Sequence, residues 1–379
     1  MRICLYTWTF LPKLGGQELV VHALAQAFNA MGHPTCVLAP RPRKVDLPAG
    51  KSLSDHDRSL GYPVIRHPRF ISTRYFLTFY ARHVQAARRQ HPFDILHAHE
   101  VHPSGYVALC AAGWERVARA FPVAITSHGG DVKAGNARLV KPGMEALYRR
   151  VITHADGLIS ISDFTDDGFT RLGASAQALT RIPNGVDLSA FATAPPRPDL
   201  LPPALQARNY HLYLGRLKDR KGIDHLLEAF AAAAPATHLA IAGAGEEEER
   251  LKSLAASLPA AAGRVHFLGR VSGDAKTWLL QNARAVVMPS TDWEAFPLVP
   301  LEAYAAGVPV IGTTVPGLRD LLPAHLGSIA IPPNDTPALT AALNSIHVGS
   351  PEARRAYAAT FAWPDIAQRH IAFFERLLK

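Results

Sequence analysis

Residues 291–307 read Thr291-Asp-Trp-Glu-Ala-Phe-Pro-Leu-Val-Pro-Leu-Glu-Ala-Tyr-Ala-Ala-Gly307, and they follow an apolar, β-branched run from Ala283 to Met288. The run predicts a buried strand. Pro300 is compatible with the first turn of a helix, because its missing N–H would have no intrahelical acceptor there. A strand, a polar loop and a helix in this order are typical of an α/β sheet that presents a ligand site. We therefore expect a ligand to bind where this loop enters the helix.

Two carboxylates lie in this stretch. Glu294 falls in the loop and Glu302 about one turn into the helix, so both can face one cleft. The amides of Leu298, Val299 and Leu301 point out of the helix start, where unpaired N–H groups bind phosphate, whereas carboxylates accept hydrogen bonds from hydroxyls. A ligand with hydroxyls at two places and phosphate between them fits this layout, and a nucleotide sugar is such a ligand.

The frame of the two glutamates, E-x-F-x-L-x-x-x-E-A with Ala-Gly-Val-Pro-Val after it, resembles that of the retaining glycosyltransferases of family four, which have the GT-B fold. A pair of glutamates alone would also fit a solvated helix face. The surrounding Phe296, Leu298, Gly307 and Pro309 make the match more specific. The resemblance implies an α/β protein of the GT-B type, in which two doubly wound Rossmann-like domains face a cleft.

Length and composition agree with a two-domain globular enzyme. The chain has 379 residues, of which 48% are apolar and 19% charged, and this length suits two domains of ordinary size. Three scattered cysteines are too few for a disulfide framework or a metal cage, which favours a reducing cytoplasm. The apolar start of the chain is too short for a signal peptide, and no apolar run approaches membrane-spanning length. We expect a cytoplasmic protein.

The alternation of strands and helices occurs twice along the chain. With the resemblance, it implies four regions: an N-terminal acceptor-binding Rossmann-like domain over 1–190, a Pro-rich linker over 191–208, a nucleotide-sugar-binding Rossmann-like domain over 209–362, and a C-terminal helix over 363–379 that packs back on the first domain. The linker contains Pro195-Pro-Arg-Pro-Asp-Leu-Leu-Pro-Pro203, which cannot be a helix or a central strand.

The first half opens with a strand, a loop and a helix. The loop ends in Gly15-Gly16, which lacks the three-glycine dinucleotide fingerprint and so weakens an NAD interpretation. The resemblance implies that this glycine pair lets the backbone approach the donor phosphates or the acceptor, although a tight turn alone would also explain it. Residues 40–62 are expected to form a long loop. Asp55-His-Asp57 formally matches the D-x-D metal motif of another glycosyltransferase fold, but it follows no strand, and we expect no metal site.

Histidines follow two predicted strands of the first half. His97 and His99 end one strand, and His128 follows the next, before Gly129-Gly130-Asp131. Ligands of open α/β sheets bind at these strand ends. A zinc site is an alternative for so many histidines, but no helical H-x-x-x-H or cysteine partner supports it. The resemblance places His128, with Asp131 nearby, at the donor sugar.

Two cations follow the first strand of the second half. In Gly215-Arg-Leu-Lys-Asp-Arg-Lys-Gly222, Arg216 and Lys221 can meet one diphosphate, Arg as a fork and Lys as a point charge. The resemblance assigns the same pair to diphosphate binding. It also implies that Gly269, Arg270 and Val271 line the base.

The resemblance further implies a mechanism. Glu302 would hold the ribose hydroxyls and Glu294 the donor sugar hydroxyls. Arg216 and Lys221 would neutralise the leaving diphosphate, so that no metal or other cofactor is needed. His128 would lie beside the anomeric centre, where its carbonyl or its ring can stabilise developing positive charge. Retention would come from attack by the acceptor hydroxyl on the face that the nucleotide leaves.

The chain departs from the family pattern in the donor-sugar loop. The family usually has glycine after Phe296, and here Pro297 removes a backbone donor. Two alternatives of other classes stay open: a sugar-nucleotide 2-epimerase of the same fold, and a non-catalytic nucleotide-sugar binder. The base, of UDP or GDP type, the sugar and the acceptor, a sugar or a lipid-linked sugar of cell-surface glycan or glycolipid synthesis, are not fixed.

Positive charge is concentrated in the first half. Residues 1–190 carry 22 Lys and Arg against 14 Asp and Glu, and residues 191–379 carry 18 against 17. An ordinary basic protein, an anionic acceptor or an anionic membrane face would each explain this imbalance. Arg74 to Gln90 can form a basic amphipathic helix at the inner face of a membrane, or a surface helix with its aromatics toward the core. The sequence has no recognisable nucleic-acid-binding module, so we expect no nucleic acid partner.

Overall fold

The computed structural model describes residues 1–43, 46–47, 52–69, 77–114, 119–233, 237–345 and 349–379. The chain divides into two compact units. Unit 1 comprises Met1–Asn184 together with Trp363–Lys379, and unit 2 comprises Gly185–Ala362.

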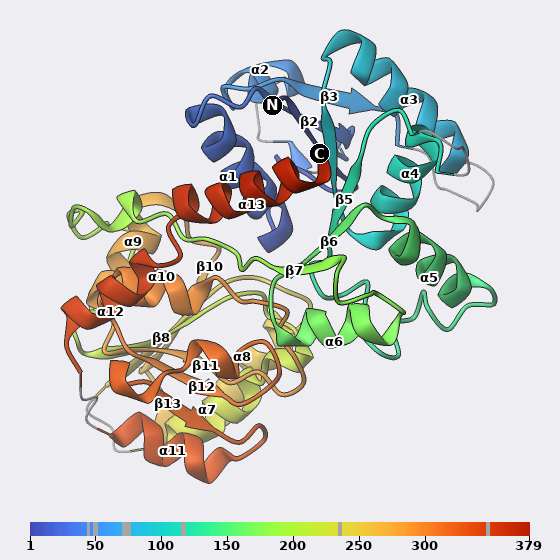
Figure 1. The fold of residues 1–379 in the computed structure, drawn as a ribbon. Helices are drawn as coiled ribbons and strands as arrows, with labels where there is room; N and C mark the ends of the chain where they lie inside the picture. Colours follow the sequence, from blue (N-terminus) through green and yellow to red (C-terminus); the bar gives the residue numbers. More distant parts are fainter. Residues whose placement is uncertain (44–45, 48–51, 70–76, 115–118, 234–236, 346–348) are drawn as a thin grey trace. The chain divides into compact units, whose positions relative to one another are not determined.

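Unit 1 is built on a seven-stranded parallel sheet in the order β3-β2-β1-β4-β5-β6-β7 (Figure 1). The strands are β1 (Ile3–Thr7), β2 (Thr35–Pro40), β3 (Val64–His67), β4 (Ile95–His99), β5 (Val123–Thr126), β6 (Gly157–Ser160) and β7 (Leu179–Arg181). The strand order reverses between β1 and β4. Ligands of doubly wound sheets bind outside such a reversal, at the carboxyl ends of the strands.

Helices cover both faces of this sheet. They are α1 (Gly16–Ala30), α2 (Leu53–Arg58), α3 (Leu77–Gln90), α4 (Tyr106–Ala112), α5 (Met144–His154), α6 (Asp163–Arg171) and α13 (Trp363–Leu377), with a π-helical turn over Val101–Gly105. Ser162 caps α6 through a capping box with Thr165. The expectation of a long loop over 40–62 was wrong at α2, whose N-terminus is capped by Ser52. No residue of α2 is buried, so it lacks the apolar periodicity that reveals a helix in a sequence.

The last helix, α13, completes the core of unit 1. It packs along α1, as Figure 1 shows, although it begins 333 positions after α1 ends. The ring of Phe28 on α1 lies 6.0 Å from those of both Phe374 and His370. Phe28 and Phe374 have no exposed surface. The fold of unit 1 therefore depends on residues from both ends of the chain.

Unit 2 contains a six-stranded parallel sheet in the order β10-β9-β8-β11-β12-β13. The strands are β8 (Tyr210–Leu214), β9 (His238–Ala242), β10 (Val265–Gly269), β11 (Ala285–Met288), β12 (Val310–Thr313) and β13 (Ile329–Ile331), and the helices are α7 (Ile223–Ala232), α8 (Glu248–Ala256), α9 (Gly273–Asn282), α10 (Val299–Ala305), α11 (Thr336–Asn344) and α12 (Pro351–Ala359). Short 3-10 turns occupy 189–191, 219–221, 259–261, 319–321 and 324–326. One apolar layer lies between the sheet and α9, α10 and α12, and another between the sheet and α7, α8 and α11.

The two parallel, doubly wound sheets confirm the predicted α/β class. Parallel strands are buried on both faces, which explains why each appears in the sequence as a continuous apolar run. The chain enters and leaves unit 2 side by side, because Val186 pairs with Ala362 in a parallel bridge and its N–H donates to the carbonyl of Phe361 (2.8 Å). Among the described residues, no helix combines the length and apolar character needed to span a membrane.

Candidate functional site

The candidate site in unit 2 lies at the carboxyl ends of β8 and β11. These strands are hydrogen-bonded neighbours and run parallel, so the loops that follow them, 215–222 and 289–298, emerge at one edge of the sheet. The order of the sheet reverses between these two strands, as it does between β1 and β4 in unit 1. Topology therefore brings the predicted cations and the predicted sugar-binding carboxylate together.

Lys221 and Glu294 form a buried ion pair at this edge. The Lys221 Nζ lies 2.5 Å from Glu294 Oε1, which also accepts a hydrogen bond from the Ser290 hydroxyl (2.5 Å). Glu294 is only 5% exposed. Burial lowers the pKa of Lys221, and the carboxylate of Glu294 opposes that shift. A carboxylate in this position needs such partners, because an unpaired buried charge is strongly destabilising.

Arg220 is a second cation beside Glu294, and the sequence analysis did not single it out. Its Nη1 lies 3.9 Å from Glu294 Oε2 and donates to the carbonyl of Trp293 (2.5 Å). Its guanidinium lies 4.4 Å from the centre of the Trp293 ring, a cation–π geometry. Arg220 could have been noticed as the third basic residue between Gly215 and Gly222, but only the fold shows that it turns toward Glu294.

Arg216, the other predicted diphosphate ligand, is exposed. Its carbonyl accepts a hydrogen bond from the Tyr213 hydroxyl (2.7 Å), which fixes the backbone of the loop. Its guanidinium has no ion pair with any residue that the structure describes. The two predicted cations therefore differ: Lys221 is neutralised by Glu294, whereas Arg216 carries its charge on the surface.

Glu302 lies in the first turn of α10 and forms an ion pair with a different cation, Lys276. Its Oε1 is 2.6 Å from the Nζ of Lys276, on α9. Both side chains are partly buried, at 29% exposure for Lys276 and 16% for Glu302. Leu298 is the N-cap of α10, and Val299 is its first residue. No local signal in the sequence indicates Lys276, because the pair depends on the packing of α9 against α10.

Two glycines let the loops of this site approach each other. Gly222 has a φ of +62°, and a Cβ there would lie 2.1 Å from the carbonyl oxygen of Pro289. Gly317 has a φ of +76°, and a Cβ there would lie 1.9 Å from the carbonyl oxygen of Glu294. Any side chain at either position would push apart the loops that hold Lys221 and Glu294.

The predicted base-binding residues lie at the end of β10, the edge strand of the sheet. Gly269 has a φ of +63°, and its carbonyl accepts a hydrogen bond from the amide of Gly243 (2.7 Å). Arg270 is exposed, and Val271 packs on the apolar layer beneath α9 and α10. In the loop predicted to contact the donor sugar, Phe296 packs on the same layer, and Pro297 follows it.

In unit 1, the predicted histidines form a contiguous group, in which His97 and His99 have no exposed surface and His128 is partly buried. The Nδ1 of His99 lies 2.9 Å from the Nε2 of His128, and the two rings stack. The Nε2 of His97 lies 2.7 Å from the hydroxyl of Thr126. Burial lowers the pKa of His128 to about 4. It also lowers the pKa values of His97 and His99 well below the usual value, and neighbouring histidines lower these two further. All three rings are therefore neutral at pH 7.

Asp131 is buried and bonded to the protein through both oxygens. One oxygen accepts from the amide of Val101 and the other from the hydroxyl of Ser127, at 2.6 Å each. Asp131 thus ties the segment after β4 to the segment after β5. Gly15 is the N-cap of α1, and a Cβ on Gly16 would meet no atom within 4 Å.

Glu100, the residue after β4, is a titratable group that the sequence analysis missed. Burial, reinforced by Asp131, raises the pKa of its carboxyl to about 8. Its φ is +82°, a left-handed conformation that is uncommon outside glycine. Strained backbone and a perturbed pKa are both enriched at functional sites. Only the preceding histidines marked this strand end in the sequence.

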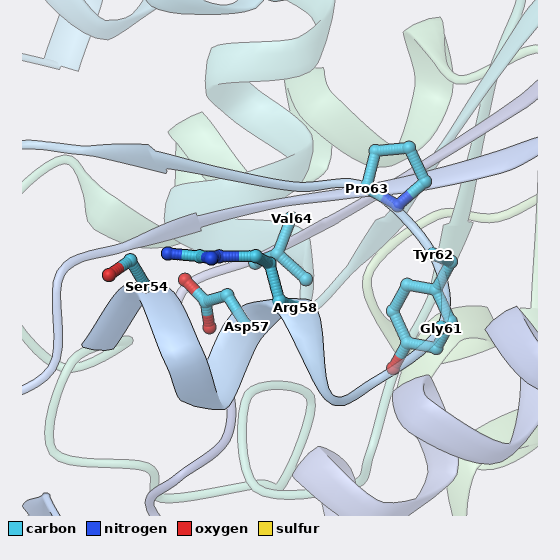
Figure 2. Close-up of a pocket in the computed structure, with 7 residues that line it drawn as sticks. All are labelled: Ser54, Asp57, Arg58, Gly61, Tyr62, Pro63 and Val64. Atoms are coloured by element: carbon cyan, nitrogen blue, oxygen red, sulfur yellow. The ribbon is translucent and has the colours of Figure 1, made fainter. Parts of the chain in front are cut away.

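The D-x-D sequence forms intramolecular ion pairs. Asp57 pairs with Arg66 at 2.6 Å and Asp55 with Arg58 at 3.3 Å. Figure 2 shows Asp57 and Arg58 on α2, beside a surface depression of about 540 Å³ that Tyr62 also lines. None of the predicted site residues lines this depression. In the described part of the chain, no three His, Cys, Asp or Glu side chains are grouped as metal ligands would be.

The amphipathic helix expected over Arg74–Gln90 appears as α3, and residues 74–76 lie outside the described residues. Tyr80 and Val84 are completely buried, so one face of α3 is a core face. Phe79 is 43% exposed, and Arg82 is exposed. The opposite face therefore carries an aromatic ring and a cation.

Comparisons with known proteins agree along nearly the whole chain. A family model described as glycosyl transferases group 1 matches residues 203–362, and one described as glycosyltransferase family 4 matches residues 14–190. A phosphatidyl-myo-inositol mannosyltransferase of Mycolicibacterium smegmatis is 30% identical over 338 residues, which cover 88% of this chain and 81% of that protein. A glycogen synthase of Mycobacterium tuberculosis is 29% identical over 400 residues, 97% of this chain and 92% of that one.

Solved structures share the fold. A sucrose-phosphate synthase from Thermosynechococcus elongatus has a TM-score of 0.76 at 24% identity, covering 99% of this chain and 98% of that one. HepE from Anabaena, in complex with UDP, has a TM-score of 0.79 at 18% identity, covering 99% and 100%. At these identities the likeness establishes the GT-B architecture.

Proposed function

Because the chain belongs to the group 1 glycosyl transferases, we propose that it is a retaining, metal-independent enzyme that transfers a sugar from a UDP or GDP sugar to a hydroxyl of a sugar or lipid-linked acceptor. Its place would be in cell-surface glycan or glycolipid synthesis. Unit 2 would bind the donor and unit 1 the acceptor.

The observation that carries this proposal is the meeting of Lys221 and Glu294 at the carboxyl ends of β8 and β11 (2.5 Å). A donor needs an acceptor of hydroxyl hydrogen bonds beside a cation for phosphate, and this pair supplies both groups at contact distance. Glu294 keeps lone pairs for sugar hydroxyls, because a carboxylate accepts about four hydrogen bonds. Glu302, held by Lys276, would accept the ribose hydroxyls.

Metal independence would follow from the cations of the loop after β8. The diphosphate gains negative charge as it leaves, and Arg216 and Lys221 would stabilise it from fixed positions. Leu298 and Val299 would add backbone amides. Arg220 supports the same role, because it keeps a positive charge beside Glu294 when Lys221 turns to phosphate.

Unit 1 would supply His128 at the anomeric centre, with Gly15, Gly16 and Asp131 shaping the surrounding loops. Retention would come from attack by the acceptor on the face that the nucleotide leaves. Gly269, Arg270 and Val271 would line the base, and Phe296 and Pro297 would border the donor sugar.

The nucleotide class is suggested by relatives. A related mannosyltransferase of Corynebacterium glutamicum is named as GDP-mannose-dependent, and the structure of HepE contains UDP. Two of the relatives act on phosphatidylinositol lipids by name. An acceptor with a lipid anchor would place unit 1 near an anionic membrane face, where the exposed Phe79 and Arg82 of α3 could touch it.

The test is turnover with purified protein. UDP and GDP sugars would first be ranked by thermal shift, because a ligand stabilises only the folded state that binds it. The best donor would then be incubated with sugar and lipid-linked acceptors, in EDTA, and the anomeric configuration of the product read by NMR.

Arg216→Ala should lower turnover roughly a hundredfold, on the scale for losing one fixed charge donor. Arg250→Ala, an exposed arginine on α8, is the matched control and should leave the rate unchanged. Conversion of donor to an isomer without acceptor would indicate a 2-epimerase. Donor binding with no turnover would indicate a non-catalytic binder, and an inverted product or strict metal dependence would contradict the proposed mechanism.

A further inference from the structure

His99 and His128 contact each other by their ring nitrogens, and this contact decides how His128 can act. We propose that His99 is a positioning residue: its Nδ1–H donates to Nε2 of His128 and so holds His128 in the tautomer that carries its proton on Nδ1. The role of the ring toward a donor sugar rests on the proposed function, whereas the tautomer does not.

The distance requires one donor and one acceptor. His99 Nδ1 and His128 Nε2 are 2.9 Å apart, and both rings are neutral, because burial lowers both pKa values. A neutral imidazole has one N–H and one lone pair. Two arrangements are therefore available, and they differ in which ring donates.

The second nitrogen of His99 distinguishes the two arrangements. His99 has no exposed surface, and its Nε2 is buried without a hydrogen-bond partner among the described residues. If His128 donated, His99 would carry its own proton on Nε2, and a buried N–H would be left without an acceptor. Orphaned buried N–H groups are rarer than under-satisfied acceptors. The proton of His99 therefore belongs on Nδ1, where it has an acceptor.

His97 shows the same arrangement next to this pair. Its Nδ1 is buried without a partner among the described residues, and its Nε2 lies 2.7 Å from the hydroxyl of Thr126. Its ring stands 4.3 Å from that of His99 and 5.3 Å from Phe374 of α13. Among the described residues, His99 therefore has a single hydrogen-bond partner, His128.

The consequence is chemical. With Nε2 of His128 occupied by His99, the remaining ring nitrogen is an N–H donor. The ring can then donate a hydrogen bond to a sugar hydroxyl, but it has no lone pair with which to accept a proton or to stabilise positive charge.

The experiment is long-range proton–nitrogen NMR on histidine-labelled full-length protein at pH 7. The His128 ring would be assigned by the signals lost in His128→Asn. Wild type should show His128 protonated on Nδ1. His99→Asn, whose amide places a donor near the original Nδ1, should keep this tautomer, and His99→Leu should lose it. His91→Leu, at an exposed position after α3, is the control and should leave the tautomer of His128 unchanged.

Kinetics separate positioning from folding. His99→Leu should lower kcat at least tenfold, while His99→Asn should stay within about threefold of wild type. His128 protonated on Nε2 in the wild type would overturn the inference, as would an unchanged tautomer and kcat in His99→Leu. If His99→Leu does not fold, wild type and His99→Asn still decide the tautomer. Failure to transfer any sugar would contradict the proposed function, but it would not affect the tautomer determined by NMR.

Discussion

Replacing Lys221 with methionine should destabilise unit 2 and slow the reaction together. The substitution keeps most of the side-chain volume and removes the ammonium that lies 2.5 Å from Glu294. Glu294, 5% exposed, would keep the Ser290 hydroxyl at 2.5 Å and Arg220 at 3.9 Å. Breaking a buried pair typically costs about 3–5 kcal/mol, and we expect about 2–3 kcal/mol here because these two partners remain.

A double-mutant cycle isolates the pair. Glu294→Gln removes the charge that Lys221→Met leaves unpaired, so the double variant should be less destabilised than the sum of the two single variants. The coupling should be about 2 kcal/mol, within the range for residues in direct contact. The turnover of Lys221→Met should fall about a hundredfold, and restoring stability through Glu294→Gln should not restore it.

The stability assay is native-state hydrogen exchange of the amides in β8 and β11, which reports unit 2 separately from unit 1. Lys252→Met is the matched control, because Lys252 pairs with Glu248 (2.9 Å) while 42% exposed, and loss of a surface pair should change stability far less than Lys221→Met does. A loss below about 0.5 kcal/mol for Lys221→Met, or strict additivity in the cycle, would refute the interpretation of the buried pair.

Three further outcomes follow from contacts at the two candidate sites. Lys276→Met should weaken binding of the cognate nucleoside diphosphate about tenfold by calorimetry and that of its 2′,3′-dideoxy analogue little, because on the proposed function Lys276 would orient Glu302 toward the ribose hydroxyls. Equal losses for the two ligands would contradict this role. The pKa of Glu100 is raised to about 8, so between about pH 4.5 and 8 the folded state holds a proton on this carboxyl that the unfolded state has released. The free energy of unfolding therefore falls as the pH rises through this range. Urea unfolding should show that wild type loses about 2 kcal/mol between pH 6 and 8.5 and that Glu100→Gln loses little. Burial lowers the pKa of His128 and His370 to about 4, so on acidification the unfolded state binds protons at these histidines before the folded state does. Each histidine should therefore lower the free energy of unfolding by about 2 kcal/mol between pH 7 and 5. His370→Phe should reduce the loss measured by urea unfolding of unit 1.

The fold was predictable because the signal for each parallel strand is local. Runs such as that ending at Met288 are apolar throughout, and each is followed by a turn and an amphipathic helix. The helix α2 gave no such signal, because none of its residues is buried. Loop 215–222 and loop 289–298 could be expected near each other once β8 and β11 were assigned to the same sheet edge.

The partners of individual side chains were not predictable in the same way. The pairing of Lys276 with Glu302 depends on how α9 packs on α10, and the raised pKa of Glu100 depends on burial beside Asp131. Both are products of contacts between segments that are distant in sequence. Conversely, Asp131 was singled out for the ligand, and the structure adds an architectural use for it, since both its oxygens bind protein groups.

The return of α13 to unit 1 has a bearing on how the protein is made. During synthesis, residues 363–377 leave the ribosome only after the whole of unit 2, so the nascent unit 1 waits with the apolar surface around Phe28 and His97 uncovered. A stop codon before position 363 would therefore be expected to damage the first unit that is translated rather than the one that has just been completed.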